Sequence, residues 1–331
     1  MSALPEVTEA PLDEAEAQAA FAAMLDGTVP DESIAPFLIA LAERGESASE
    51  IAGAARAMRA RMIPITAPEG AIDVCGTGGD GQHSLNVSTA VSIVVAACGV
   101  PVAKHGNRAA SSKAGAADTL EALGLNLDRA AETAEMTLGD LGICFLFAQR
   151  HHPALARIAP IRKALGRRTI FNLMGPLANP ASVRRQLVGI ARPAYVAIYA
   201  EAIRRLGTDH SLVISGDEGL DELSLAGGNE LAQVKDGSVV MRRLTAADAG
   251  LAAAPVDALR GGDAAFNAAA LRALLQGEPG AYRDAVLLNA AAALIVAGEA
   301  ADWHEGVEEA AEAIDKGLAN ALLNCWIAAL T

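Results

Sequence analysis

At 331 residues, 52% of them hydrophobic, the chain is long enough to bury one large core or two smaller ones, which excludes a disordered protein. Its formal net charge of -14 at pH 7 would repel a nucleic-acid backbone, and an aromatic content of 3% leaves few rings to stack on bases. We therefore expect no nucleic-acid partner.

The N-terminus has acidic residues where a signal peptide needs a basic start and an apolar stretch. No run in the chain reaches the roughly 18 consecutive apolar residues of a membrane helix. The four cysteines, at positions 75, 98, 144 and 325, are far apart and lack a metal-binding spacing. These features predict a cytoplasmic protein with reduced thiols and no membrane contact.

Three helical patterns follow one another near the N-terminus, each opened by a capping or acidic residue. They span residues 12–25, 31–42 and 47–62. A segment with prolines at both ends, residues 64–68, closes the series. We predict a small all-helical N-terminal domain over residues 1–68, joined by parts of 153–176.

After residue 68 the pattern changes to short apolar runs that alternate with helical stretches, which is typical of a parallel sheet covered by helices. The strand-like runs lie at residues 71–75, 101–105, 143–148, 186–190, 211–215, 231–235 and 238–243. Asp236 and Gly237 between the last two runs predict a hairpin. We therefore predict an α/β fold whose large domain, residues 69–331, has a mostly parallel mixed central sheet.

Helical patterns fill much of the remaining chain. They span residues 88–98, 114–123, 195–206, 281–297 and 307–330. The apolar spacing predicts helix throughout the C-terminal part, from about residue 263 onward.

The strongest local signal is the strand AIDVC, which runs directly into a glycine-rich loop, residues 76–81, and then into an apolar helix. Glycines let backbone N–H groups approach an oxyanion, and the helix N-terminus adds unpaired donors. A phosphate or pyrophosphate would fit there. The alternative, a tight turn in which Ser88 and Thr89 merely cap the helix, is equally compatible with this loop alone.

A second loop follows the next predicted strand and carries Lys104, His105, Arg108 and Lys113 in a chain with only five lysines. Parallel strands deliver their loops to one sheet edge, so this basic loop should lie beside the glycine loop and help to clamp a polyphosphate. The other interpretation of such a run is a solvated basic surface.

Two further groups stand out downstream. Asp221 and Glu222 follow a predicted strand, and adjacent carboxylates suit Mg²⁺ when a phosphate ligand completes its shell, although such pairs also occur in plain turns. Arg162 can hold a carboxylate through its guanidinium fork, or simply face solvent on a helix. His151 and His152 precede Pro153 and can simply flank a helix start.

Six segments together resemble one family. GTGGD, NVST, KHGNRAASSKAG, the helix of Arg162, FNLMGPLANP and GLDELSL occur in the order found in anthranilate phosphoribosyltransferases, whose fold is shared with pyrimidine nucleoside phosphorylases. The resemblance spans nearly the whole chain. It implies an active site in a cleft between the two domains and a homodimer formed through the helical domain. Two positions depart from the pattern: Leu85, where an aromatic residue is expected, and Ala116, where a serine is common.

The resemblance also implies a role for individual residues. Those expected to bind phosphoribosyl pyrophosphate are Gly76, Gly79, Asp80, Ser84, Asn86, Val87, Ser88, Thr89, Lys104, His105, Gly106, Asn107, Arg108, Ala109, Ala110, Ser111, Ser112 and Ala116. Those expected to contact anthranilate are Gly76, Asn107, Arg162, Gly175 and Pro176, and those expected to hold Mg²⁺ are Ser88, Asp221 and Glu222. No residue is singled out as a general acid or base.

The implied reaction transfers the phosphoribosyl group to the amine of anthranilate, through an oxocarbenium-like state, in tryptophan biosynthesis. Two rivals remain at this point. A nucleoside phosphorylase would share the fold and a phosphate loop without needing Asp221 and Glu222, and a non-catalytic relative linked to nucleic acid would lack several of these motifs.

Overall fold

The computed structural model describes residues 4–109 and 113–331. Its centre is one sheet of seven strands in the order β3-β2-β1-β4-β5-β6-β7. The strands are β1 Ile72–Gly76, β2 Val102–Gly106, β3 Ile143–Phe147, β4 Arg185–Gly189, β5 His210–Gly216, β6 Asn229–Lys235 and β7 Ser238–Leu244. The predicted α/β fold with a small helical N-terminal part is therefore confirmed.

Strands β1 to β5 are parallel, while β6 runs antiparallel to β5 and β7 antiparallel to β6. The predicted hairpin is present, with Lys235 opposite Ser238 and both turn residues, Asp236 and Gly237, at positive φ. Because the first five strands are parallel, the segments that follow β1, β2, β4 and β5 all leave from one edge of the sheet.

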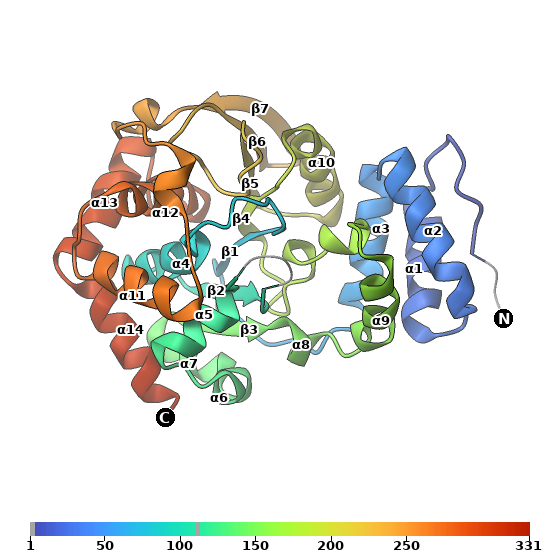
Figure 1. The fold of residues 1–331 in the computed structure, drawn as a ribbon, viewed down its shortest axis with the longest axis horizontal. Helices are drawn as coiled ribbons and strands as arrows, with labels where there is room; N and C mark the ends of the chain where they lie inside the picture. Colours follow the sequence, from blue (N-terminus) through green and yellow to red (C-terminus); the bar gives the residue numbers. More distant parts are fainter. Residues whose placement is uncertain (1–3, 110–112) are drawn as a thin grey trace.

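Helices cover both faces of the sheet and form one end of the molecule (Figure 1). The α-helices of the described residues are α1 Glu14–Asp26, α2 Asp31–Arg44, α3 Ala48–Arg59, α4 Val87–Ala97, α5 Ala116–Leu123, α6 Leu127–Glu132, α7 Ala134–Leu141, α8 Ala148–His151, α9 Leu155–Leu165, α10 Val196–Leu206, α11 Ala264–Leu275, α12 Ala281–Ala297, α13 Trp303–Asp315 and α14 Leu318–Ala329. Short 3₁₀ turns lie at Ile170–Asn172, Pro176–Ala178, Pro193–Tyr195, Ala246–Ala249 and Val256–Leu259.

Strand alternation divides the apolar side chains between the two faces. Leu187 and Leu212 join a cluster with α4 and α11 to α14, whereas Val188 and Val213 join a second cluster on the opposite face. That second cluster also contains side chains of α1, α2, α3, α9 and α10. The helical end therefore shares its core with the sheet instead of having a separate one.

Helix α9 lies beside α1 and α2 (Figure 1), although it is more than 100 residues further along the chain. Ile158 of α9 is fully buried in the same cluster as Phe21 and Ile51. The segment from Gly166 to Thr169 then returns the chain from this helical end to the sheet.

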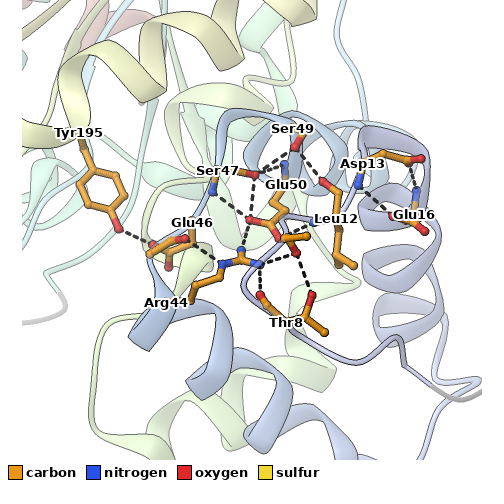
Figure 2. Close-up of polar contacts among 12 residues, drawn as sticks. Thr8, Leu12, Asp13, Glu16, Arg44, Glu46, Ser47, Ser49, Glu50 and Tyr195 are labelled. Carbon is orange, nitrogen blue, oxygen red and sulfur yellow. Dashed lines mark hydrogen bonds and ion pairs between the residues drawn. The ribbon is translucent and has the colours of Figure 1, made fainter.

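A buried carboxylate organises the helical end (Figure 2). Glu50 is fully buried and accepts hydrogen bonds from Leu12 N at 3.0 Å and from Ser47 N at 2.9 Å, and it forms an ion pair with Arg44. Glu50 therefore joins the chain before α1 to the turn between α2 and α3. Next to it, Tyr195 Oη donates to Glu46 Oε2 at 2.7 Å, which links the helical end to the segment after β4.

One predicted helix was wrong in extent. The apolar spacing over residues 307–330 predicted a single helix, but Gly317 has φ 73° and separates α13 from α14. None of the helices in the described part of the chain is long and apolar enough to cross a membrane. The four cysteines are free thiols, of which Cys75 and Cys144 are buried, Cys98 is half-buried and Cys325 is exposed.

Candidate active site

The glycine-rich loop and the Asp221–Glu222 segment meet at the carboxyl edge of the sheet. Gly78, Gly79 and Gly81 have φ of 70°, 72° and 77°, a region that glycine adopts without steric cost. Gly78 N donates to Asp221 Oδ2 at 2.7 Å. The approach is so close that a Cβ on Gly76 would lie 2.2 Å from Asp221 Oδ2, so a side chain there would displace the Asp221 carboxylate.

Burial and mutual repulsion make the carboxylates of this edge costly to ionise. The pKa of Asp221 is raised to about 7, first by burial and then by the charge of Asp80. Burial, followed by the charge of Asp221, raises the pKa of Glu222 to about 8. Asp80 Oδ2 is buried and has no hydrogen-bond partner among the described residues. A divalent cation would favour the ionised forms of Asp221 and Glu222, so this carboxylate pair fits Mg²⁺.

The first turn of α4 closes this group of acidic residues. Ser88 N donates to Glu222 Oε1 at 3.0 Å, which joins the start of α4 to the acidic pair. Among the described residues no set of three or more His, Cys, Asp or Glu side chains is arranged to hold a metal. A cation here would therefore depend on Asp221, Glu222, the Ser88 hydroxyl and oxygens of a ligand.

Lys104 points into the fold instead of along the surface. It is 2% exposed, and its Nζ donates to Val74 O at 2.8 Å and to Ser88 Oγ at 3.4 Å. Burial lowers its pKa, and the nearby Asp73 carboxylate opposes that shift. Asp73 also accepts a hydrogen bond from His105 N at 3.1 Å. The Lys104 ammonium thus lies between strand β1 and the start of α4, where it contacts Ser88.

The Asn86–Thr89 turn is held mainly by internal contacts. Asn86 Oδ1 accepts from Thr119 Oγ1 at 2.5 Å and from Asn267 Nδ2 at 2.9 Å. Thr89 Oγ1 is buried without a hydrogen-bond partner among the described residues. Ser84 pairs with Arg260 in an isolated β-bridge. The turn is therefore anchored to α5 and α11 by contacts that do not involve a ligand.

The second predicted loop starts beside the first but turns toward α5. Arg108 pairs with Asp118 at 2.9 Å and with Glu121 at 2.8 Å, and Asp118 also accepts from Ala109 N at 2.9 Å. Asn107 Oδ1 accepts from Arg108 N at 2.8 Å. Three residues expected to bind the sugar phosphate, Ala110, Ser111 and Ser112, lie outside the described residues.

Gly106 and Ala116 pack behind this second loop. A Cβ on Gly106 would lie 2.7 Å from the Phe145 ring and 3.3 Å from the Ala116 side chain. The base of the second loop is therefore close-packed at Gly106, which has no room for a side chain unless Phe145 moves.

Two neutral histidines lie on the other side of β2. His105 Nδ1 is 2.9 Å from Gly175 O, and its Nε2 is 3.2 Å from Nε2 of His152. Burial is the main cause that lowers the pKa of His105 to about 3 and that of His152 to about 4. Gly175 precedes the 3₁₀ turn Pro176–Ala178. Through the contact with His105, Gly175 and Pro176, both expected to contact anthranilate, lie next to the start of the second loop.

Arg162 lies in the last turn of α9 with its guanidinium carbon 5.5 Å from the centre of the Phe171 ring. Within residues 4–109 and 113–331 it has no acidic partner, and partial burial lowers its pKa. A half-buried guanidinium of this kind is available to a carboxylate ligand.

A cavity of about 210 Å³ lies between the helical end and the sheet edge. Its walls include Glu46, Arg168, Thr169, Asn172, Arg192 and Tyr195. Neither Asn107 nor Arg162 lines it, so the predicted anthranilate contacts are not part of this cavity.

Sequence reasoning missed three residues of this region. Asp73 could have been found, because a carboxylate within an apolar strand needs a buried partner such as Lys104. His152 was noted only as a possible helix flank, yet its ring contacts His105. Arg168 was not considered, although its guanidinium donates to Gly78 O at 3.0 Å and to Gly79 O at 2.9 Å.

Comparison with known proteins gives consistent results over the whole chain. Residues 7–62 match the glycosyl transferase family, helical bundle domain, and residues 68–320 match the glycosyl transferase family, a/b domain. The anthranilate phosphoribosyltransferase of Novosphingobium aromaticivorans is 82% identical over 330 residues, with 100% of each chain covered.

Two solved structures are also close. The anthranilate phosphoribosyltransferase of Thermus thermophilus superposes with a TM-score of 0.90 at 44% identity, covering 97% of each chain. The Saccharomyces cerevisiae protein, in complex with phosphoribosyl pyrophosphate and magnesium, has a TM-score of 0.88 at 26% identity, covering 96% of this chain and 93% of its own.

Proposed function

This chain belongs to the anthranilate phosphoribosyltransferase family of glycosyltransferases, and we propose that its reaction takes place at the carboxyl edge of the sheet. It transfers the phosphoribosyl group of phosphoribosyl pyrophosphate to the amine of anthranilate, in tryptophan biosynthesis, and releases pyrophosphate. The observation that carries the location is the convergence of the glycine loop, the first turn of α4 and two carboxylates with raised pKa values.

We propose that the sugar phosphate lies along the glycine loop and the first turn of α4. Backbone N–H groups of such a loop and helix start are suited to phosphate oxygens. The remaining residues expected from the resemblance extend the site along the second loop, from Lys104 to Ser112 and to Ala116. Lys104 would contribute indirectly, by orienting the Ser88 hydroxyl, because its ammonium donates to that hydroxyl and to the carbonyl of Val74.

Magnesium is proposed to bind Ser88, Asp221 and Glu222. The raised pKa values of the two carboxylates support this assignment, because a cation stabilises their ionised forms. The yeast relative is described in complex with both phosphoribosyl pyrophosphate and magnesium. When bound, the ion would neutralise charge on the departing pyrophosphate.

Anthranilate is proposed to bind on the other side of the glycine loop, near Gly76, Asn107, Arg162, Gly175 and Pro176. Arg162 would orient its carboxylate, because its half-buried guanidinium has no acidic partner among the described residues. The amine has a free lone pair, so positioning can supply much of the rate and no strong base is required. The bond from ribose C1 to pyrophosphate breaks as the amine bonds to the opposite face of C1, and the nitrogen then releases one proton to solvent.

Further proposals come with the family. The first is a division into a helical domain, residues 1–68 with parts of 153–176, and an α/β domain, residues 69–331. The packing of α9 on α1 and α2 supports this division. A homodimer formed through the helical domain and a cytoplasmic location are the others, and sedimentation equilibrium of the purified chain tests the dimer.

One experiment tests the function as a whole. The chain is mixed with anthranilate, phosphoribosyl pyrophosphate and Mg²⁺, and the fall of anthranilate fluorescence is followed. We expect a fall that stops when the metal is chelated. No fall, together with phosphorolysis of pyrimidine nucleosides in a parallel assay, would instead identify a nucleoside phosphorylase.

A further inference from the structure

Arg168 lies in the segment from Gly166 to Thr169 after α9, called the hinge below, and connects it to the glycine loop. Its two terminal guanidinium nitrogens donate separately, to Gly79 O at 2.9 Å and to Gly78 O at 3.0 Å. The contact bridges 89 to 90 residues of sequence. Arg168 therefore fixes two successive peptide groups of a loop whose glycines, at positive φ, have little conformational preference of their own.

Fixing these carbonyls also fixes the direction of two amides. The peptide carbonyl of Gly78 shares its plane with the N–H of Gly79, and that of Gly79 shares its plane with the N–H of Asp80. In a trans peptide the N–H points opposite to the C=O, and none of the described peptide bonds is cis. Both N–H groups must therefore point away from Arg168.

These two amides have no hydrogen-bond acceptor among the described residues, whereas the neighbouring Gly78 N–H is occupied by Asp221. Asp221 thus holds the loop through one amide while Arg168 holds it through the next two carbonyls. What remains is a pair of adjacent, oriented and unoccupied donors beside the carboxylate pair, which suits an oxyanion.

We propose that Arg168 is a positioning residue for the sugar-phosphate substrate. It acts through the backbone, by aiming the N–H groups of Gly79 and Asp80 at the pyrophosphate, and does not itself touch the substrate. The proposal rests on the proposed function, since it requires pyrophosphate oxygens at the glycine loop. In addition, the conformation of the glycine loop depends on a residue of the hinge that joins the helical end to the sheet.

The neighbouring arginine provides a matched control. Arg167 is adjacent in sequence and, like Arg168, lines the cavity described above, but its guanidinium pairs with Glu43 at 3.1 Å. Arg167→Ala removes the same charge from the same hinge without touching the glycine loop. A general effect of charge or of hinge packing would appear in both variants.

The test measures kcat and both KM values for the wild type, Arg168→Ala, Arg168→Lys and Arg167→Ala, and the Kd for phosphoribosyl pyrophosphate with Mg²⁺ by calorimetry. In Arg168→Ala we expect KM and Kd for the sugar phosphate to rise about ten- to a hundredfold, since two charge-assisted hydrogen bonds that orient its donors are lost. KM for anthranilate should stay within about twofold. Lysine, which cannot hold two carbonyls in a fork, should give an intermediate value.

Several outcomes would overturn the proposal. One is an unchanged KM for the sugar phosphate in Arg168→Ala, and another is a rise in KM for anthranilate alone. Equal rises in both variants, or a loss of activity that follows only a lower melting temperature, would make Arg168 merely structural. If the wild type bound no phosphoribosyl pyrophosphate at all, the proposed function would fail first, and that result is distinct from any difference between variants.

Discussion

Arg162 combines a half-buried guanidinium with the absence of an acidic partner in the described part of the chain. Arg162→Ala should therefore raise KM for anthranilate much more than KM for the sugar phosphate. A lost charge-assisted contact costs about 1.5 to 3 kcal/mol, or roughly ten- to a hundredfold in affinity. Steady-state kinetics with each substrate varied in turn checks this prediction.

Two variants sharpen the Arg162 measurement. Arg162→Lys should restore only part of the affinity, because a point charge cannot reproduce a bidentate contact. Arg157→Ala on the same helix removes an arginine that pairs with Asp31 at the surface, and it should change neither KM. A rise in KM for the sugar phosphate instead would place Arg162 in the phosphate site.

Asp221 and Glu222 are predicted to bind a metal ion, although their burial lowers the stability of the folded chain when no metal is bound. The double variant Asp221→Asn, Glu222→Gln should lose most of its turnover while remaining folded, and added Mg²⁺ should not restore activity. A magnesium titration of wild type and variant makes the measurement. Equal activity of the two proteins across the titration would remove the metal assignment.

The raised pKa values of Asp221 and Glu222 predict that stability without Mg²⁺ depends on pH, and the same double variant tests this. Both carboxyls have folded pKa values, about 7 and about 8, above those of the unfolded chain. The folded state therefore loses stability as the pH rises from about 4, where both states are protonated, to about 8, where the folded carboxyls have ionised as well. The variant should melt higher than wild type at pH 8, and this difference should shrink toward pH 5.

From the sequence, the convergence of segments at the sheet edge was predictable, but the directions of individual side chains there were not. The glycine loop, Asp221 and Glu222 do converge, because parallel strands deliver their loops to one edge. The directions of Lys104 and Arg108 were not predictable in the same way. Lys104 turns inward toward Asp73, and Arg108 pairs with Asp118 and Glu121, and both choices depend on three-dimensional neighbours.

Among the elements, the end of strand β4 constrains the site most tightly. A Cβ on Gly189 would lie 1.6 Å from Asp221 O, so Gly189→Ala must displace either the strand or the segment of Asp221. Overpacking of this kind costs about 1 to 3 kcal/mol, and the displaced carboxylate should lower turnover as well. Chemical denaturation and the activity assay provide the two readings.

Gly139→Ala is the matched control for that prediction. Gly139 lies in α7, is exposed and has no atom within 4 Å of an added Cβ. Alanine should stabilise the helix there by up to about 1 kcal/mol and leave turnover unchanged. If Gly189→Ala behaved like Gly139→Ala, the proposed fit between β4 and the Asp221 segment would be wrong.

Strands and most helices were predictable from the apolar pattern. The predicted run 281–297 coincides with α12, and residues 238–243 fall within β7. Helices α6 and α7 were missed because their six and eight residues show no clear apolar repeat. The predicted helix 307–330 failed for another reason, since the apolar spacing continues across Gly317 while the backbone does not.

For the molecule as a whole, the core shared by the helical end and the sheet predicts cooperative unfolding. Side chains of α1, α3, α9 and α10 lie in one cluster with strand residues such as Val188. Exposing either part alone would leave the other's apolar surface in water. Differential scanning calorimetry should therefore show one transition, and two well-separated transitions would contradict this prediction.

Glu50 provides a perturbation of that transition. Glu50→Gln leaves the mostly buried Arg44 without its ion pair and should cost about 3 kcal/mol. The single transition should move to lower temperature without splitting. Glu43→Gln, which removes an exposed carboxylate near the same end, should have a much smaller effect.

The distribution of the cysteines has a practical consequence. Burial raises the pKa of Cys75 and Cys144, and that of Cys98 to about 12, while Cys325 is exposed. Because the thiolate is the nucleophile, a maleimide probe should attach to the native chain at Cys325 alone and to all four thiols once the chain unfolds. The number of labels per molecule, read by mass spectrometry, then counts unfolded chains without any engineered reporter.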